Sequence, residues 1–145
     1  YEKRENMKRK VVTDASVILS YILEENPTMI KRFEKLLNDV REKKVEILSQ
    51  PLVSLEVANG LRFKLMKDGN LAREIFKTFL QLPFKLVPLT KVQQEKALSL
   101  SLEIGTTVYD TSYHILAKSH GATFLTADRE YFKKAKILDD IELWE

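Results

Sequence analysis

Residues 106–132 read TTVYDTSYHILAKSHGATFLTADREYF, and our interpretation of the fold starts from this stretch. Its first half predicts a helix with Asp110 near the start, because the apolar residues 115–117 follow closely. His120 and Gly121 end that helix with a basic residue and a glycine, which is common helix-stop chemistry. An acidic side chain is therefore expected close to a helix N-terminus.

The second half of the stretch predicts a strand that ends in a carboxylate. Ala122–Leu125 is a short apolar run suited to a buried parallel strand, and Thr126 and Asp128 follow it. Residues 11–14, VVTD, repeat this arrangement with Asp14 at the end of an earlier strand. In open parallel sheets, functional groups collect just beyond the carboxyl ends of the strands. We therefore expect Asp14, Asp110 and Asp128 to form one constellation.

The remaining chain alternates between strand and helix signals. Asn26 followed by Pro27, and Thr90 followed by an amphipathic run, indicate helix starts, while Gly105 indicates a helix end. Strands are predicted at residues 10–14, 45–48, 84–89, 122–125 and 141–144, and further helices at residues 17–23, 27–43, 51–65, 71–82, 92–104 and 131–135. This alternation predicts an α/β fold with a parallel sheet covered on both faces.

Composition restricts the class of protein. The chain has 145 residues, of which 44% are hydrophobic and 31% charged, with a formal net charge of +3 and no cysteine. Without cysteine there is no disulfide scaffold, thiol nucleophile or thiolate zinc site. No apolar run approaches the roughly 20 residues of a membrane span, so we expect a cytoplasmic protein without a membrane partner. We interpret residues 1–145 as a single domain with a flexible N-terminal extension at residues 1–8.

Four acidic residues stand in apolar surroundings: Asp14, Glu56, Asp110 and Asp128. Each could be a helix cap, a salt-bridged core group or a cation ligand, because an unpaired buried carboxylate is costly. Glu56 lies one turn into its predicted helix, so all four could meet at the same sheet edge. Converging carboxylates raise one another's pKa unless a cation lies between them, and Mg²⁺ or Mn²⁺ prefers such oxygen ligands. These residues favour phosphodiester hydrolysis by a metal-activated water.

Four segments, VVTDASVIL, SLEVANGL, YDTSYHILA and TFLTADREYF, resemble the PIN domain family, and in particular the VapC-type toxin ribonucleases of VapBC toxin–antitoxin pairs. The family's four acids fall on Asp14, Glu56, Asp110 and Asp128. Its accompanying hydroxyl residues fall on Ser16 and Thr126, which would orient Asp14. The resemblance implies a three-layer α/β/α fold with a central, mostly parallel sheet of four to five strands.

The resemblance also implies an activity and partners. These are a Mg²⁺- or Mn²⁺-dependent endoribonuclease, an RNA substrate, a cognate antitoxin protein and a homodimer. We expect amphipathic residues 27–43 and 71–82 to supply the dimer face and an antitoxin groove. Arg62, Lys118 and Arg129 could contact RNA phosphates, although each is more often a solvated charge. His114 is interpreted as a packed histidine rather than a metal ligand.

Three other interpretations remain open. A haloacid-dehalogenase-type phosphatase would use Asp14 as a nucleophile, but it needs a second aspartate where this chain has Ser16. A non-catalytic domain binding RNA or protein would be expected to lack acids that this chain has. A PIN nuclease of RNA processing, as opposed to a toxin, shares every motif described above.

Overall fold

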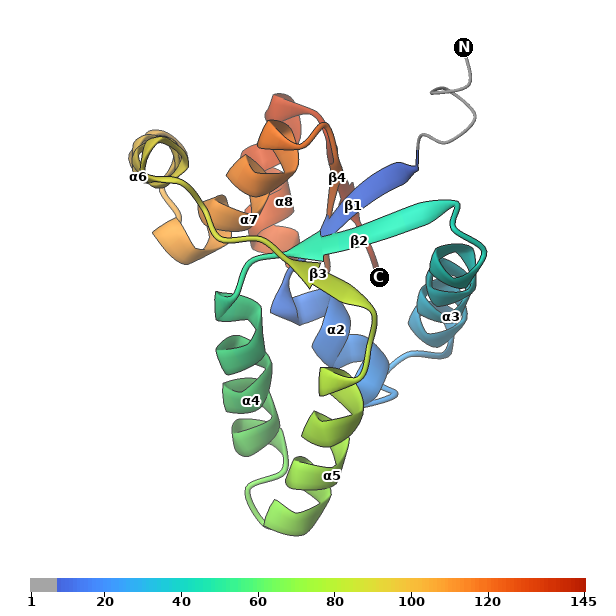
Figure 1. Ribbon diagram of the computed structural model, residues 1–145. Helices are drawn as coiled ribbons and strands as arrows, with labels where there is room; N and C mark the ends of the chain where they lie inside the picture. Colours follow the sequence, from blue (N-terminus) through green and yellow to red (C-terminus); the bar gives the residue numbers. More distant parts are fainter. Residues whose placement is uncertain (1–7) are drawn as a thin grey trace.

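The computed structural model describes residues 8–145 and shows five parallel strands in one sheet with helices on both faces (Figure 1). The strands are β1 Arg9–Thr13, β2 Val45–Ser49, β3 Phe84–Leu86, β4 Thr123–Thr126 and β5 Ile141–Leu143. The helices are α2 Ala15–Ile22, α3 Pro27–Arg41, α4 Leu52–Lys64, α5 Gly69–Leu80, α6 Lys91–Ile104, α7 Val108–Ser119 and α8 Arg129–Ala135, followed by a 3₁₀ turn, Lys136–Leu138. The predicted three-layer α/β fold is confirmed.

The strand order β3-β2-β1-β4-β5 places β1 at the centre. Val11 and Val12 point to opposite faces of the sheet, as successive side chains of a strand do. Both are fully buried, because helices cover both faces. Val12 packs in the larger core with α2, α4 and α7, whereas Val11 packs with Met29 and Phe33 of α3 on the other face. Burial on both faces explains the continuous apolar runs of the central strands.

Local sequence signals set several helix boundaries as predicted. Asn26 caps α3 with Pro27 at the first helical position, and Thr90 forms a capping box with Gln93 at the start of α6. Gly105 ends α6 in the left-handed conformation, with φ of 71°, which glycine adopts without steric penalty. These boundaries needed no information from the rest of the fold.

Other boundaries and orientations differ from the prediction. The third strand ends at Leu86 rather than residue 89, because Pro88 has no N–H to donate to β2. Helix α5 begins earlier, at Gly69, because Asp68 accepts a hydrogen bond from the Leu71 N–H. The helical period of residues 71–82 predicts that Ile75, Phe76, Phe79 and Leu80 face inward, but Leu80 is 58% exposed.

Two other sequence predictions concern the chain ends and the membrane. The proposed extension, residues 1–8, falls outside the described residues except for Lys8. Between residues 8 and 145, no helix combines the length and apolar character needed to cross a membrane.

Candidate active site at the carboxyl edge of the sheet

Asp14 lies at the carboxyl end of the central strand and receives three hydrogen bonds. It caps α2, since its Oδ1 accepts from the Val17 N–H at 3.2 Å, and the same oxygen accepts from Ser16 Oγ at 2.5 Å. Its Oδ2 accepts from Thr126 Oγ1 at 2.6 Å. The carboxylate is therefore held on both oxygens by groups from β4 and α2.

The two hydroxyls that donate to Asp14 are themselves fixed by the loop after β4. Ser16 Oγ accepts from the Ala127 N–H at 2.9 Å, and Thr126 Oγ1 accepts from the Asp128 N–H at 3.1 Å. Each backbone N–H thus orients one hydroxyl, and each hydroxyl donates to one Asp14 oxygen. Chains of hydrogen bonds of this kind polarise and strengthen one another.

Asp110 lies in the first turn of α7. Thr107 caps this helix by accepting from the Asp110 N–H at 3.2 Å, and Thr106 Oγ1 donates to Asp110 Oδ2 at 2.9 Å. A carboxylate is stabilised here by the positive end of the helix dipole. Because α7 runs back toward β4, its first turn lies at the same sheet edge as Asp14.

Glu56 reaches the site from α4. Its Oε1 accepts a hydrogen bond from the Tyr113 hydroxyl, whose side chain is buried and stacks on Phe124 of β4. Burial raises the pKa of the Glu56 carboxyl above its usual value, and the charge on Asp110 adds to that rise. Tyr113 thereby ties α4 to α7 at the position of two of the predicted acids.

Asp128 is placed differently from the other three acids. It caps α8, because its Oδ1 accepts from the Tyr131 N–H at 3.0 Å. Its link to Asp14 runs through Thr126, which accepts from the backbone of Asp128 and donates to Asp14. The cap that we considered as an alternative for each acid is therefore present at both Asp14 and Asp128.

The electrostatics indicate that Asp14, Glu56 and Asp110 converge. Burial raises the pKa of the Asp14 carboxyl to about 6, while the hydrogen bonds from Ser16, Thr126 and the Val17 N–H oppose the rise and the charge on Asp110 adds to it. Asp110 also acts on Glu56. Carboxylates that raise one another's pKa form a site where a cation would be stabilised.

The side-chain atoms at this edge are of the kind that bind a hard divalent cation. The groups gathered at this edge are carboxylate and hydroxyl oxygens, which Mg²⁺ and Mn²⁺ prefer. Within residues 8–145, however, no group of three His, Asp or Glu side chains is placed to share one ion. The ligand roles predicted for Asp14, Glu56, Asp110 and Asp128 therefore stay predictions.

The three basic residues predicted to contact RNA lie in different places. Arg129 follows Asp128 directly and forms an ion pair with Glu145. Arg62 lies on α4 beyond Glu56 and lines a pocket between α4 and α5. Lys118 lies in the last turn of α7 and donates to the Leu138 carbonyl at 3.0 Å, so it is close to the amino edge of the sheet. The structure does not bring Lys118 to the acids.

His114 is a packed residue, as predicted. It is fully buried, its Nε2 lies 3.2 Å from the Asp139 carbonyl and its Nδ1 lies 2.8 Å from the Tyr131 hydroxyl. A carbonyl only accepts, so Nε2 donates. Burial lowers the pKa of His114, and in the neutral ring Nδ1 then accepts from Tyr131.

Sequence reasoning missed two residues of the site. Tyr113 was given no role in the site, although its position three residues after Asp110 puts both on one face of a helix. Thr106 was not considered. The hydroxyl pair Thr106 and Thr107 directly before a helix was the available signal for both the cap and the Asp110 contact.

Comparison with known proteins agrees with this architecture. The model of the family described as "PIN domain" matches residues 11–138. A search of curated proteins finds no match. Among solved structures, PAE2754 from Pyrobaculum aerophilum is 27% identical and superposes with a TM-score of 0.65, covering 88% of this chain and 87% of its own.

Two more distant structures share the fold alone. One is VapBC2 from Rickettsia felis, bound to a DNA fragment from its promoter, with 15% identity, a TM-score of 0.69 and coverage of 94% and 99% of the two chains. The other is a toxin–antitoxin complex from Klebsiella pneumoniae, with 13% identity, a TM-score of 0.61 and coverage of 91% and 95%.

Proposed function

This chain belongs to the PIN domain family, and from that premise we propose that it is a Mg²⁺- or Mn²⁺-dependent endoribonuclease that serves as the toxin of a toxin–antitoxin pair. Members of the family are in general nucleases. The observation that supports the proposal best is the placement of Asp14, Glu56 and Asp110 at one sheet edge, where burial raises the pKa of Asp14 and Glu56 and the charge of Asp110 adds to both rises.

The proposed roles follow from the position of each side chain. Asp14 and Asp110 hold the ion, and Asp128 holds it directly or through water. Glu56 completes the set or orients the attacking water, with Tyr113 fixing its carboxylate. Ser16 and Thr126 keep both oxygens of Asp14 in place. When bound, the ion would neutralise charge on the phosphate and lower the pKa of a water.

A test of this proposal compares the ends of cleaved RNA. Purified protein with Mn²⁺ or Mg²⁺ is expected to cut RNA internally, without ATP, and to stop when EDTA is added. Attack by water that breaks the bond from phosphorus to the 3′-oxygen leaves a 5′-phosphate and a 3′-hydroxyl, and no cyclic phosphate forms because the ribose 2′-hydroxyl is not the nucleophile. Asp110→Asn is the control, and it should remove activity while its circular dichroism spectrum matches that of the wild type. A 2′,3′-cyclic phosphate formed in EDTA would overturn the mechanism.

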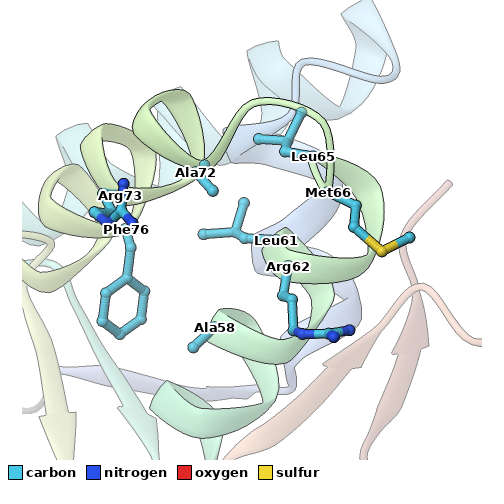
Figure 2. A pocket seen from close by; sticks show the side chains of 9 residues that line it. Ala58, Leu61, Arg62, Leu65, Met66, Ala72, Arg73 and Phe76 are labelled. Carbon is cyan, nitrogen blue, oxygen red and sulfur yellow. The ribbon is translucent and has the colours of Figure 1, made fainter.

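An antitoxin partner is supported by the surface between α4 and α5. A pocket of about 430 Å³ lies there, with apolar side chains such as Leu61 and Phe76 inside and Arg62 and Arg73 among its lining residues (Figure 2). The structures of similar fold include a toxin–antitoxin complex. A partner segment with apolar anchors and flanking acids would match this pocket in shape and charge.

The partner proposal is tested by co-expression with any small protein encoded next to this gene. Arg62→Glu combined with Arg73→Glu should weaken a copurifying complex, since both charges of the pocket are reversed. Lys67→Glu combined with Lys77→Glu is a matched control, because it changes the net charge by the same amount in the α4–α5 region at residues that do not line the pocket. Equal weakening by both pairs would contradict a specific role of this pocket.

We also propose a homodimer, but not through the whole of the predicted surface. Met29, Phe33 and Leu36 of α3 are buried against the sheet and cannot serve a dimer. Exposed apolar side chains remain on α5, at Leu71 and Leu80. Sedimentation that shows only monomer at high micromolar concentration would contradict the dimer.

RNA processing is the alternative for the same nuclease. The side chains of the site would serve either role. Growth arrest on expression, relieved by the neighbouring gene product, would favour the toxin.

A further inference from the structure

A cavity of about 560 Å³ lies beside the acidic site and plays no part in the functions proposed above. Its walls come from three segments: the turn after β2, the connection from β3 to α6 with α6 itself, and the first turns of α7. The residues used below are Gln50, Pro51, Pro88, Tyr109 and Ser112, all of which line it.

The cavity adjoins the site through α7 and α4. Tyr109 directly precedes Asp110, and Ser112 lies two residues after it. Gln50 follows the carboxyl end of β2, where the chain turns into the helix that carries Glu56. Because β1 and β2 are parallel neighbours, Gln50 after β2 lies at the same sheet edge as Asp14 after β1. An RNA strand that runs along this edge from the acids would place a neighbouring nucleotide at the mouth of the cavity.

The orientation of the Gln50 amide is fixed by its neighbour. Ser112 Oγ lies 2.5 Å from the Tyr109 carbonyl, and because a carbonyl only accepts, the hydroxyl donates its one hydrogen there. Ser112 must then accept from Gln50, so the Nε2 side of the amide faces Ser112. This leaves Oε1 as the outward acceptor of a side chain that is only 8% exposed.

That oxygen is available to a ligand. Among residues 8–145, no hydrogen bond uses Gln50 Oε1, and it is not one of the fully buried side-chain atoms that lack a partner. It is thus an acceptor reached from outside, held in one direction by a buried hydrogen bond. A fixed acceptor of this kind distinguishes ligands that present an N–H from those that present a carbonyl.

The walls of the cavity suit a flat aromatic ligand. Tyr109 is 62% exposed and offers its ring at the edge of the site, and Pro51 and Pro88 supply apolar surface. Bases of single-stranded RNA stack on exposed aromatic side chains of this type. Stacking surface and an edge acceptor together are the two elements of base recognition.

We propose that this cavity is a specificity subsite for the nucleobase next to the cleaved bond, with Tyr109 stacking on the base and Gln50 Oε1 accepting from its amino group. The inference rests on the proposed ribonuclease function. With Gln50 Oε1 set against position 6 of a purine or position 4 of a pyrimidine, the subsite selects adenine and cytosine, which carry an amino group there, over guanine and uracil, which carry a carbonyl.

The test measures base selectivity as a ratio, so that overall activity does not decide it. RNA with a randomised segment is cleaved with Mn²⁺, and the bases flanking each cut are read by sequencing. Wild type should prefer A and C over G and U at one flanking position by about tenfold. Gln50→Met, which keeps the shape but removes the acceptor, should bring that ratio close to one. Gln81→Met, the same change at the exposed end of α5, should keep it.

A binding measurement separates this inference from the cleavage proposal. Asp110→Asn protein is titrated by fluorescence anisotropy with short RNAs that contain adenosine, or purine riboside lacking only the amino group. Adenosine should bind about tenfold more tightly, and Gln50→Met in the same background should remove the difference. Tyr109→Ala should weaken both RNAs equally, whereas Tyr109→Phe should not. Because Tyr109 is exposed, these two variants remain informative if Gln50→Met does not fold.

The outcomes are distinguishable. If the protein cuts no RNA but binds adenosine with the expected preference, the proposed function fails and the subsite stands. If it cuts RNA with the same base ratio in wild type and Gln50→Met, the subsite is overturned and the function stands. If Gln50→Met or Tyr109→Ala changes only the sedimentation of the protein, the cavity is covered by a second copy and the subsite is overturned.

Discussion

The turn after β1 and the turn after β4 are built from the same local pattern but differ in their chemistry. In each, a parallel strand ends in an aspartate that caps the next helix, Asp14 for α2 and Asp128 for α8. Asp14 receives two further hydroxyl hydrogen bonds, and burial raises its pKa to about 6, with the charge of Asp110 adding to the rise. A strand-end aspartate thus becomes part of a site only when neighbouring elements enclose it.

The largest effect expected from this comparison is on cleavage. Asp14→Asn should reduce metal-dependent RNA cleavage by more than about 100-fold, because changing a group that merely orients a ligand already costs roughly 10–100-fold. Asp128→Asn should cost less, within about 10–100-fold, since Asp128 is linked to Asp14 through Thr126 and caps a helix. The measurement is the initial rate of RNA cleavage by each variant at saturating Mn²⁺. A larger loss for Asp128→Asn than for Asp14→Asn would mean that the turn after β4 matters more for cleavage than the turn after β1.

Thr126→Val disturbs both turns at once. It removes the donor to Asp14 Oδ2 and the acceptor for the Asp128 N–H. We expect Mn²⁺ affinity, measured by titration calorimetry, to fall about 10–100-fold. Thr13→Val is the matched control at the end of the neighbouring strand, because Thr13 is equally buried and its hydroxyl has no hydrogen-bond partner among residues 8–145. Equal losses in the two variants would mean that the Thr126 bridge has no special role.

The raised pKa of Asp14 predicts a pH dependence of stability in metal-free protein. Between the usual value of 3.8 and about 6, the folded state keeps a proton that the unfolded state has lost. The free energy of unfolding should therefore fall as the pH rises through this window and level off above it. Asp14→Asn should flatten this slope and melt higher than wild type at neutral pH, in chelator.

Asp128→Asn is the control for that measurement and should keep the wild-type slope. Added Mn²⁺ should raise the melting temperature of wild type more than that of Asp14→Asn, because a ligand stabilises the state that binds it. If the free energies of unfolding of wild type and Asp14→Asn changed with pH in the same way, the claim that burial raises the pKa of Asp14 would be contradicted.

The smallest effect concerns the unpartnered hydroxyl of Thr13. Replacing it by a methyl group of similar shape removes a buried polar atom without a partner. Thr13→Val should leave the free energy of unfolding unchanged or raise it by up to about 1 kcal/mol. A clear loss of stability in chemical denaturation would indicate a hydrogen bond that the structure does not contain.

Local chemistry explains which parts of the fold were predictable from the sequence. Pro27, Thr90 and Gly105 act on their own helix ends, so those boundaries were predicted correctly. The three-layer fold, one sheet with helices on both faces, followed from the alternation of apolar strands and amphipathic helices. Leu80 was placed wrongly because its exposure depends on how α5 packs in three dimensions.

The site divides in the same way. The four acids and the hydroxyls Ser16 and Thr126 could be singled out from motifs, but not their hydrogen bonds. The Tyr113–Glu56 contact joins residues 57 positions apart, and the Gln50–Ser112 contact joins residues 62 apart. Such contacts arise only when α4 and α7 meet. The same holds for Lys118, whose place at the far edge of the sheet depends on the direction of α7.

The central position of β1 has a consequence for synthesis on the ribosome. Residues 11–13 pair with residues 123–125, so β1 waits for one of its two neighbours until more than 100 further residues have been made. Thr126 and Asp128, and with them the second oxygen contact of Asp14, arrive at the same late moment. Under the proposed function, a nascent nuclease stays incomplete on the ribosome until these residues have emerged. The order of synthesis alone thereby delays activity until residue 128 is free to join the site.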